Sequence, residues 1–248
     1  MKNDSILCLD VGNTSLKWCE FRLNDLRSNA SGYIDDVSAV VSNDIDSEFN
    51  QLAPMPVWIS HVSSEAVKQH LMDWFKEHWG ESPRFIETMP EFDGLKNSYK
   101  SPTELGVDRW LAMLSAKKLT KDAFCVIDAG TAVTIDVVDQ CGVHQGGVIM
   151  PGKRLMLQAL ISNTSSIHRL EGSVCGLADN TADAVMTGVV ACILGGVDRV
   201  LRGVRETFPE IEIVVTGGDA GLFKKSDWLT VTDLVLQGVG LVAQNEYA

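Results

Sequence analysis

One short pattern occurs twice in the chain, and the two copies are separated by almost half its length. Residues 6–18 read ILCLDVGNTSLKW, and residues 124–136 read FCVIDAGTAVTID. When Asp128 is aligned on Asp10, both copies show an apolar strand, an aspartate, a glycine, a polar turn residue and a second strand. Self-similarity at this distance predicts that the chain folds into two similar halves.

Each copy places an aspartate at the end of an apolar strand, where an unpartnered carboxylate is costly. Gly12 and Gly130 are expected to supply a positive φ and to permit a close backbone approach. The polar groups around the two turns come from Asn13, Thr14, Thr131 and Thr134. Such a loop can hold a phosphate while its carboxylate orients a hydrated metal ion. Two ordinary hairpins with Asx-type turns would also fit the pattern, but they would leave both aspartates without a reason.

The rest of the sequence alternates strands with helices, which is typical of an α/β protein. We expect strands over 57–61, 142–150 and 211–215, and helices over 64–79, 103–119, 154–161 and 181–208. Gly195–Gly196 would destabilise the last helix and favour a break or kink there. The sequence therefore predicts two α/β halves, residues 1–120 and 121–248, that pack closely and share a cleft.

The net charge of -12 and the pI near 4.8 limit the possible partners. A surface this acidic does not favour binding to nucleic acid. No stretch reaches the roughly 18 uninterrupted apolar residues of a membrane helix, so no membrane association is expected. The six cysteines form no CxxC pair, which indicates a reduced, cytoplasmic protein.

A polar segment, NSYKSPTELGVDRW at residues 97–110, leads into the helix expected over 103–119. Asp108 lies in the first turns of that helix, where the helix dipole favours its ionised form. Phosphoryl transfer needs positioning and charge stabilisation more than a strong base, so Asp108 could serve as one. Arg109 offers a planar fork for a carboxylate or phosphate. An exposed Asp–Arg pair on a helix face is the alternative.

Six segments in the same order resemble the motifs of the type III pantothenate kinases, a group related to the acetate kinase, Hsp70 and actin superfamily. They are LDVGNTSLKW, GVDRW, DAGTAVTID, GGVIMPGKRLMLQAL, NTADAVMTG and TGGDA. The resemblance covers nearly the whole chain and implies two ribonuclease H-like, actin-like ATPase halves. It also implies phosphorylation of pantothenate by ATP, the first step of coenzyme A biosynthesis.

The resemblance assigns the nucleotide and metal sites to both repeats and to the last glycine motif. Asp10 would bind Mg²⁺ through water, and Asp128 would lie beside a monovalent cation, K⁺ or NH₄⁺. The residues implied around ATP and its phosphates are Asp10, Gly12, Asn13, Thr14, Lys17, Gly130, Thr131, Thr134, Gly217 and Gly218.

The pantothenate site is implied around the GVDRW motif, with Asp108 as the base that accepts or orients the hydroxyl. The other substrate-binding residues would be Tyr99, Gly106, Val107, Arg109 and Thr181. Thr181 would come from the partner subunit of a homodimer, which we expect to pair through the apolar helix that contains Ala191. Residues 163–168 lack the Leu-Pro that the family has here, which leaves the role of this loop open.

Two other functions fit the same residues. The protein could be another phosphotransferase of the superfamily, acting on a sugar or a short-chain acid. It could also be a non-catalytic nucleotide-binding regulator that acts through a protein partner. All three aspartates of the pantothenate kinase pattern are present, which favours the enzyme.

Overall fold

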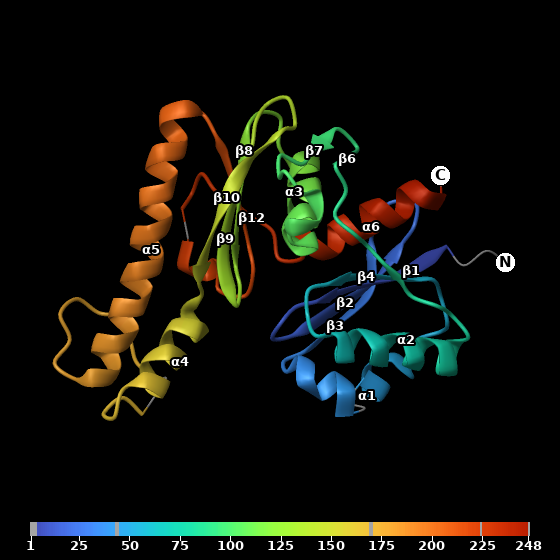
Figure 1. Ribbon diagram of the computed structural model, residues 1–248, viewed down its shortest axis with the longest axis horizontal. Coiled ribbons are helices and arrows are strands. Elements are labelled where there is room, and N and C mark those ends of the chain that lie inside the picture. The colour runs from blue at the N-terminus through green and yellow to red at the C-terminus, as the bar shows by residue number, and fades with distance from the viewer. Residues whose placement is uncertain (1–3, 43–44, 169–170, 224, 248) are drawn as a thin grey trace. The chain divides into compact units, whose positions relative to one another are not determined.

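The structure is a computed structural model that describes residues 4–42, 45–168, 171–223 and 225–247 (Figure 1). The chain divides into two compact units. The first comprises Met1–Leu119 and Asp233–Ala248, and the second comprises Thr120–Thr232. Each unit is described by itself.

The two units contain five-stranded sheets of identical topology, in the orders β3-β2-β1-β4-β5 and β10-β9-β8-β11-β12. The first sheet consists of β1 (Ser5–Val11), β2 (Leu16–Arg22), β3 (Ser28–Ile34), β4 (Val57–His61) and β5 (Arg84–Phe85). The second consists of β8 (Phe124–Ala129), β9 (Ala132–Val138), β10 (His144–Pro151), β11 (Glu212–Thr216) and β12 (Leu229–Thr230). In both sheets the first three strands are antiparallel and the last two are parallel to the first. The predicted repeat is therefore a repeat of structure.

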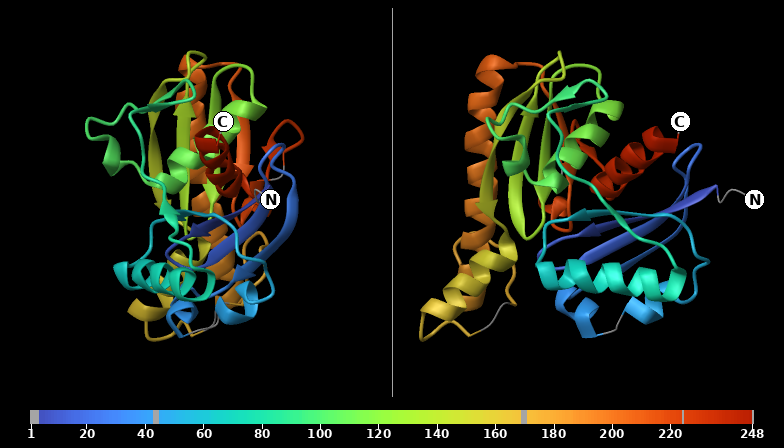
Figure 2. Two further views of the ribbon diagram at one scale, coloured as in Figure 1. Left: turned by 90° about the vertical axis from the view of Figure 1, so that its right-hand side faces the viewer. Right: turned by 45° about the vertical axis from the view of Figure 1, so that its right-hand side comes forward.

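One face of the first sheet packs on α1 (Ile45–Phe49) and α2 (Glu65–Trp79), as Figure 2 shows. The strand side chains on this face include Leu7, Leu9 and Ile59. Ser64 caps α2, since its hydroxyl accepts a hydrogen bond from the backbone N–H of Val67 at 3.4 Å. The aromatic residues of α2 pack into the core, where Trp74 and Phe75 both contact the ring of Phe49. A small two-stranded sheet, β6 (Glu91–Phe92) and β7 (Leu95–Lys96), lies in the same unit.

The other face of the first sheet is covered by α3 (Val107–Leu119) and α6 (Leu234–Tyr247). The ring of Tyr247 lies 6.5 Å from that of Trp58 in β4, and the side-chain amide of Gln244 donates to the carbonyl oxygen of Leu23 at 2.7 Å. These contacts place the last helix in the first unit. The predicted second half, which ran to residue 248, was therefore too long at its C-terminal end.

In the second unit, α4 (Lys153–Asn163) and α5 (Thr181–Thr207) pack on one face of the sheet. Strand residues Cys125 and Ile127 meet Leu157 of α4 and Ile193 of α5 in this core. Short 3₁₀ turns occur at Val37–Ser42, Pro102–Glu104 and Ala220–Phe223. The helix predicted over 103–119 begins only at Val107, because Leu105 has an extended backbone with ψ of 123°.

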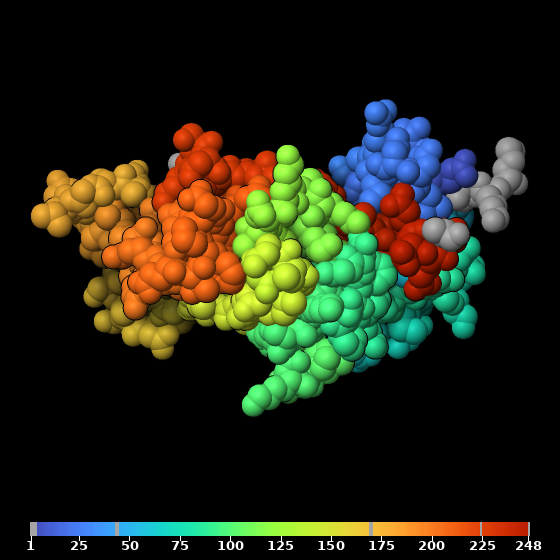
Figure 3. Space-filling view, turned by 90° about the horizontal axis from the view of Figure 1, so that it is seen from above, coloured from blue at the N-terminus to red at the C-terminus, as the bar shows by residue number. Residues whose placement is uncertain are grey.

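The longest helix, α5, continues through Gly195–Gly196 without the break that was expected there. Its length and composition would allow it to cross a membrane, and only 28% of its most apolar window is buried inside the structure. Core helices of soluble proteins can have the same length and apolar composition. Figure 3 shows part of α5, in orange, open on the molecular surface. The exposed residues in the first half of the helix are mostly small and include Ala184, Gly188 and Ala191, whereas charged residues such as Asp198 and Arg202 are exposed in the second half.

Candidate functional site

The first D-x-G segment is a hairpin that joins β1 to β2. The backbone N–H of Gly12 donates to the carbonyl oxygen of Ser15 at 3.0 Å and closes the turn. Asp10 lies opposite Lys17 in the antiparallel register, so both side chains leave the same face of the sheet. Asp10 is half-buried and has an interaction partner, as expected for a charge at the end of a buried strand.

The second D-x-G segment joins β8 to β9 in the same way. The backbone N–H of Gly130 donates to the carbonyl oxygen of Ala132 at 3.0 Å, and Asp128 lies opposite Thr134. The predicted positive φ at Gly12 and Gly130 is wrong, because neither is among the glycines with positive φ. Both hairpins turn in backbone conformations that other residues can adopt.

The glycine that the second site requires is Gly217, which follows β11 and has a φ of 94°. A β-carbon at this position would lie 2.5 Å from the carboxylate oxygen Oδ1 of Asp128 and 2.5 Å from the carbonyl oxygen of Ala129. The backbone of Gly217 therefore packs directly against Asp128 and Ala129, and any larger residue at this position would displace them. Gly218, in contrast, is exposed, and a β-carbon there would meet nothing.

A pair of charges lies beside the second loop. Lys153, the first residue of α4, forms an ion pair with Asp219, and both side chains are about a quarter to a third exposed, at 32% and 26%. The backbone N–H of Asp219 donates to the carbonyl oxygen of Ala129 at 2.9 Å, and that of Gly152 donates to Thr131 at 3.0 Å. The PGK and TGGDA segments thus converge on the second loop.

The GVDRW motif forms the first turn of α3. Arg109 is buried, with 7% exposure, and its Nη1 donates to the hydroxyl oxygen of Tyr99 at 3.2 Å. The guanidinium carbon also lies 5.9 Å from the centre of the Tyr99 ring. Tyr99 is held in its loop because its backbone N–H donates to the side-chain oxygen of Asn97 at 2.9 Å. Two predicted substrate-binding residues are therefore in direct contact.

Asp108 folds back over the residue that precedes the helix. Its Oδ1 accepts a hydrogen bond from the backbone N–H of Arg109 at 2.8 Å. A β-carbon at Gly106 would lie 2.6 Å from the same oxygen. Gly106 therefore leaves the space in which the Asp108 carboxylate lies. The adjacent Val107, the first residue of α3, is buried.

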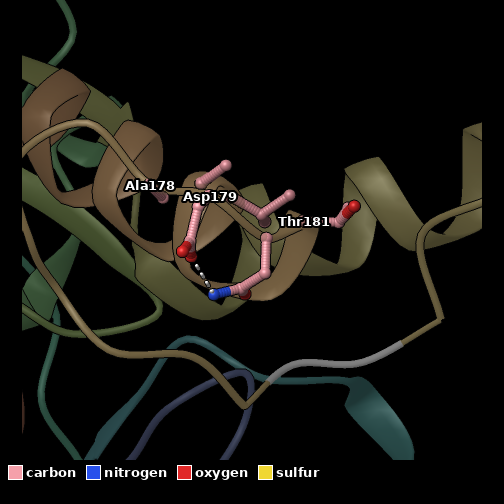
Figure 4. Close-up of a pocket in the computed structure, with 6 residues that line it drawn as sticks. Ala178, Asp179 and Thr181 are labelled. Atoms are coloured by element: carbon pink, nitrogen blue, oxygen red, sulfur yellow. Dashed lines mark hydrogen bonds between the residues drawn. The ribbon is translucent and has the colours of Figure 1, made fainter.

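Thr181 is the first residue of α5 and lines a surface hollow (Figure 4). This hollow has a volume of 510 Å³ and is lined by Ala178, Asp179, Asn180, Thr181, Ala184 and Val185. Thr181 also lines a second hollow of 190 Å³, together with Ser166, Ile167, His168 and Ala182. The loop that lacks the family's Leu-Pro thus contributes to a pocket beside Thr181.

The start of α5 is fixed by a cap. Asn180 accepts a hydrogen bond from the backbone N–H of Asp183 at 3.0 Å and donates its amide to the Asp183 carboxylate at 2.8 Å. This amide, followed by the backbone N–H of Ser173, lowers the pKa of the exposed Asp183 carboxyl below its ordinary value. Such reciprocal capping sets the first turn of the helix and with it the position of Thr181.

Within the described ranges, no group of three or more His, Cys, Asp and Glu side chains is arranged to hold a metal ion. Magnesium in phosphoryl-transfer enzymes keeps several waters and uses one or two carboxylates together with the substrate phosphates. Single aspartates such as Asp10 fit that mode of binding. The two oxygens beside Gly217 are the hard donors that a monovalent cation also prefers.

The repeated sheet topology and the paired D-x-G hairpins define an actin-like α/β fold of the kind that carries small-molecule kinases. Two solved structures share it. A conserved Campylobacter jejuni protein described as a Baf family transcriptional activator matches with a TM-score of 0.61 at 18% identity, covering 97% of this chain and 98% of that one. A Sinorhizobium meliloti protein described as a 2-dehydro-3-deoxygalactonokinase matches with a TM-score of 0.60 at 11% identity, covering 98% of each.

Sequence comparison identifies the family within that fold. The model of the type III pantothenate kinase family matches residues 6–203. The type III pantothenate kinase of Polaromonas sp. strain JS666 is 32% identical over 98% of this chain and 99% of its own length. The chain therefore belongs to the type III pantothenate kinase family. The predicted family, fold class and enzyme class are confirmed.

One feature of the site was not predicted. Lys153 and Asp219 lie in motifs that were noticed, but an ion pair between residues so far apart leaves no local signal. The TGGD segment did signal a glycine-dependent turn, and Gly217 provides it.

We predict that Gly106→Ala lowers turnover roughly 10- to 100-fold, because a methyl group would displace the Asp108 carboxylate from its position. The melting temperature should change little, since only the end of a short side chain must move. Steady-state kinetics and thermal melting measure both effects. Gly221→Ala is the matched control, because a β-carbon there meets no atom within 4 Å. Equal turnover of Gly106→Ala and the unaltered protein would contradict the role given to Gly106.

Proposed function

We propose that this protein transfers the γ-phosphoryl group of ATP to the 4′-hydroxyl of pantothenate, as the first step of coenzyme A biosynthesis. The observation that carries the proposal is the start of α3, where the Asp108 carboxylate lies over Gly106 beside the buried Arg109–Tyr99 pair. This arrangement occurs in a chain that belongs to the type III pantothenate kinase family.

In the proposed reaction, Asp108 accepts a hydrogen bond from the 4′-hydroxyl and receives its proton as the new phosphate ester forms. The first turn of α3 favours the ionised carboxylate that this role requires. Arg109 would bind the pantothenate carboxylate, and Tyr99, Gly106 and Val107 would shape the remaining contacts. Positioning of the hydroxyl in line with the phosphorus atom is the main contribution of these residues.

ATP would bind along the two hairpins. Gly12, Asn13 and Thr14 would offer backbone and side-chain donors to the phosphates, with Lys17 as a point charge. The corresponding groups of the second hairpin are Gly130, Thr131 and Thr134. Gly217 and Gly218 would let the backbone lie against the adenosine.

Two ions complete the proposal. Asp10 would hold Mg²⁺ through its water shell, and the charge of that ion would offset the charge of the phosphates. Asp128 would hold K⁺ or NH₄⁺, and the carbonyl oxygen of Ala129, which lies beside the same glycine, would be a further oxygen ligand. In the absence of ATP, neither the Asp10 nor the Asp128 carboxylate alone would provide enough ligands to bind its ion tightly.

We further propose that the protein acts as a homodimer that pairs through α5. The exposed side of this helix carries Ala184, Gly188, Ala191, Cys192 and Gly195. Small side chains at this spacing allow two helix backbones to approach closely, as a symmetric interface requires. Thr181 lies at the start of the same helix and would reach pantothenate in the partner's site. The six free cysteines agree with action in the reducing cytoplasm.

Asp108→Asn is predicted to lower kcat roughly 100- to 1,000-fold, because the amide can neither accept the hydroxyl proton nor orient the hydroxyl as a carboxylate does. ATP binding should be unchanged, since no ATP contact is assigned to Asp108. Single-turnover kinetics and calorimetric titration of an ATP analogue separate the two effects. Turnover equal to that of the unaltered protein would remove Asp108 from the reaction.

Mixing two impaired variants tests whether the site is shared. Thr181→Ala should raise the KM for pantothenate, and Asp108→Asn should lower kcat. In a mixed dimer, one of the two sites would contain both unaltered residues. Since random exchange of an equal mixture makes half of the dimers mixed, activity at low pantothenate should recover toward about a quarter of the original. Exchange is followed by native mass spectrometry with a heavy-isotope subunit. Full exchange without recovery would show that Thr181 does not act across a dimer interface.

A further inference from the structure

Ser60 is a buried polar residue that the proposed reaction does not yet use. It lies in β4, its exposure is 0%, and its hydroxyl oxygen has no hydrogen-bond partner in the described part of the chain. Leaving a buried hydroxyl unsatisfied is unfavourable, and most buried polar side chains in folded proteins have a partner. A residue that persists in this state needs an explanation.

The sheet register places Ser60 beside the first aspartate. In the parallel pairing of β1 with β4, Ser60 lies directly opposite Asp10. Residues opposite one another in a sheet point to the same face, so the Ser60 hydroxyl and the Asp10 carboxylate share one face. The preceding residue, Ile59, points to the other face and is part of the core with α2. Ser60 thus lies outside that core, on the face that α3 and α6 cover, directly beside Asp10.

The second unit offers an internal comparison, since its sheet has the same topology. Thr216 occupies the position that corresponds to Ser60, directly opposite Asp128 in the parallel pairing of β8 with β11. Thr216 is also buried, with 3% exposure, but its hydroxyl donates to the carbonyl oxygen of Thr232 at 3.5 Å. The fold therefore places a hydroxyl beside each aspartate. Among the described residues, the hydroxyl of Thr216 has an acceptor and the hydroxyl of Ser60 has none.

We propose that Ser60 is a positioning residue for the divalent ion: its hydroxyl donates a hydrogen bond to a water in the shell of the ion held by Asp10. A metal-bound water is a strong partner because it is polarised by the ion, and a hydroxyl on the same face as the carboxylate can reach it. The inference rests on the proposed role of Asp10. It adds a second protein group to a metal site that otherwise has one.

Ser60→Ala tests the inference through metal-dependent nucleotide binding, without turnover. Calorimetry measures the binding of a non-hydrolysable ATP analogue while the Mg²⁺ concentration is varied. The Mg²⁺ concentration at half-maximal binding should rise about tenfold, the size of one hydrogen bond to a charged group. The ligand-free variant should melt at or above the temperature of the unaltered protein, because the substitution removes an unsatisfied hydroxyl.

Ser115→Ala is the matched control. Ser115 is a buried serine of the same unit, with 2% exposure, and its hydroxyl also lacks a partner among the described residues, but it lies on α3 and is not paired with Asp10. Its substitution should leave the Mg²⁺ requirement unchanged. An unchanged requirement in Ser60→Ala, or an equal rise in both serine variants, would overturn the inference.

Asp10→Asn distinguishes failure of this inference from failure of the proposed function. If Asp10→Asn raises the Mg²⁺ requirement and Ser60→Ala does not, Ser60 has no role at the ion while the role of Asp10 stands. If neither substitution changes the requirement, Asp10 does not hold the ion, and both the inference and that part of the proposed function are wrong.

Discussion

A carboxylate at the end of a buried strand is the constraint around which each unit is organised. In both units the central strand carries apolar side chains into a core and then ends in an aspartate on its opposite face. A charge there requires compensation from ions, donors or water. The hairpin that follows each aspartate, and the parallel strand beside it, supply the groups that can provide it.

The two units have diverged in the groups that surround these aspartates. Asp10 lies between Lys17 on one neighbouring strand and Ser60 on the other. Asp128 lies between Thr134 and Thr216, with the backbone of Gly217 packed against its carboxylate. These differences in the neighbouring groups are the basis on which we propose a hydrated divalent ion at Asp10 and a monovalent cation at Asp128.

Local signals in the sequence were sufficient for the elements that depend on neighbouring residues. The strand Val57–His61 and the helix Glu65–Trp79 were predicted nearly as observed, because apolar runs and capping residues such as Ser64 act over a few positions. The final helix was missed because its nearly continuous apolar sequence has no clear amphipathic pattern, and its partners are far away in the chain. The positive φ was assigned to Gly12 and Gly130 instead of Gly217, since a glycine's conformation depends on the atoms that approach it. The Lys153–Asp219 pair exists only after folding.

The most direct test of the account is whether the purified protein phosphorylates pantothenate. The protein would be incubated with ATP, Mg²⁺ and pantothenate, with and without K⁺, and the products would be identified by mass spectrometry. The account predicts 4′-phosphopantothenate, formed much faster when K⁺ is present. A folded protein that binds ATP but forms no phosphopantothenate, or that phosphorylates a sugar or a short-chain acid instead, would contradict it.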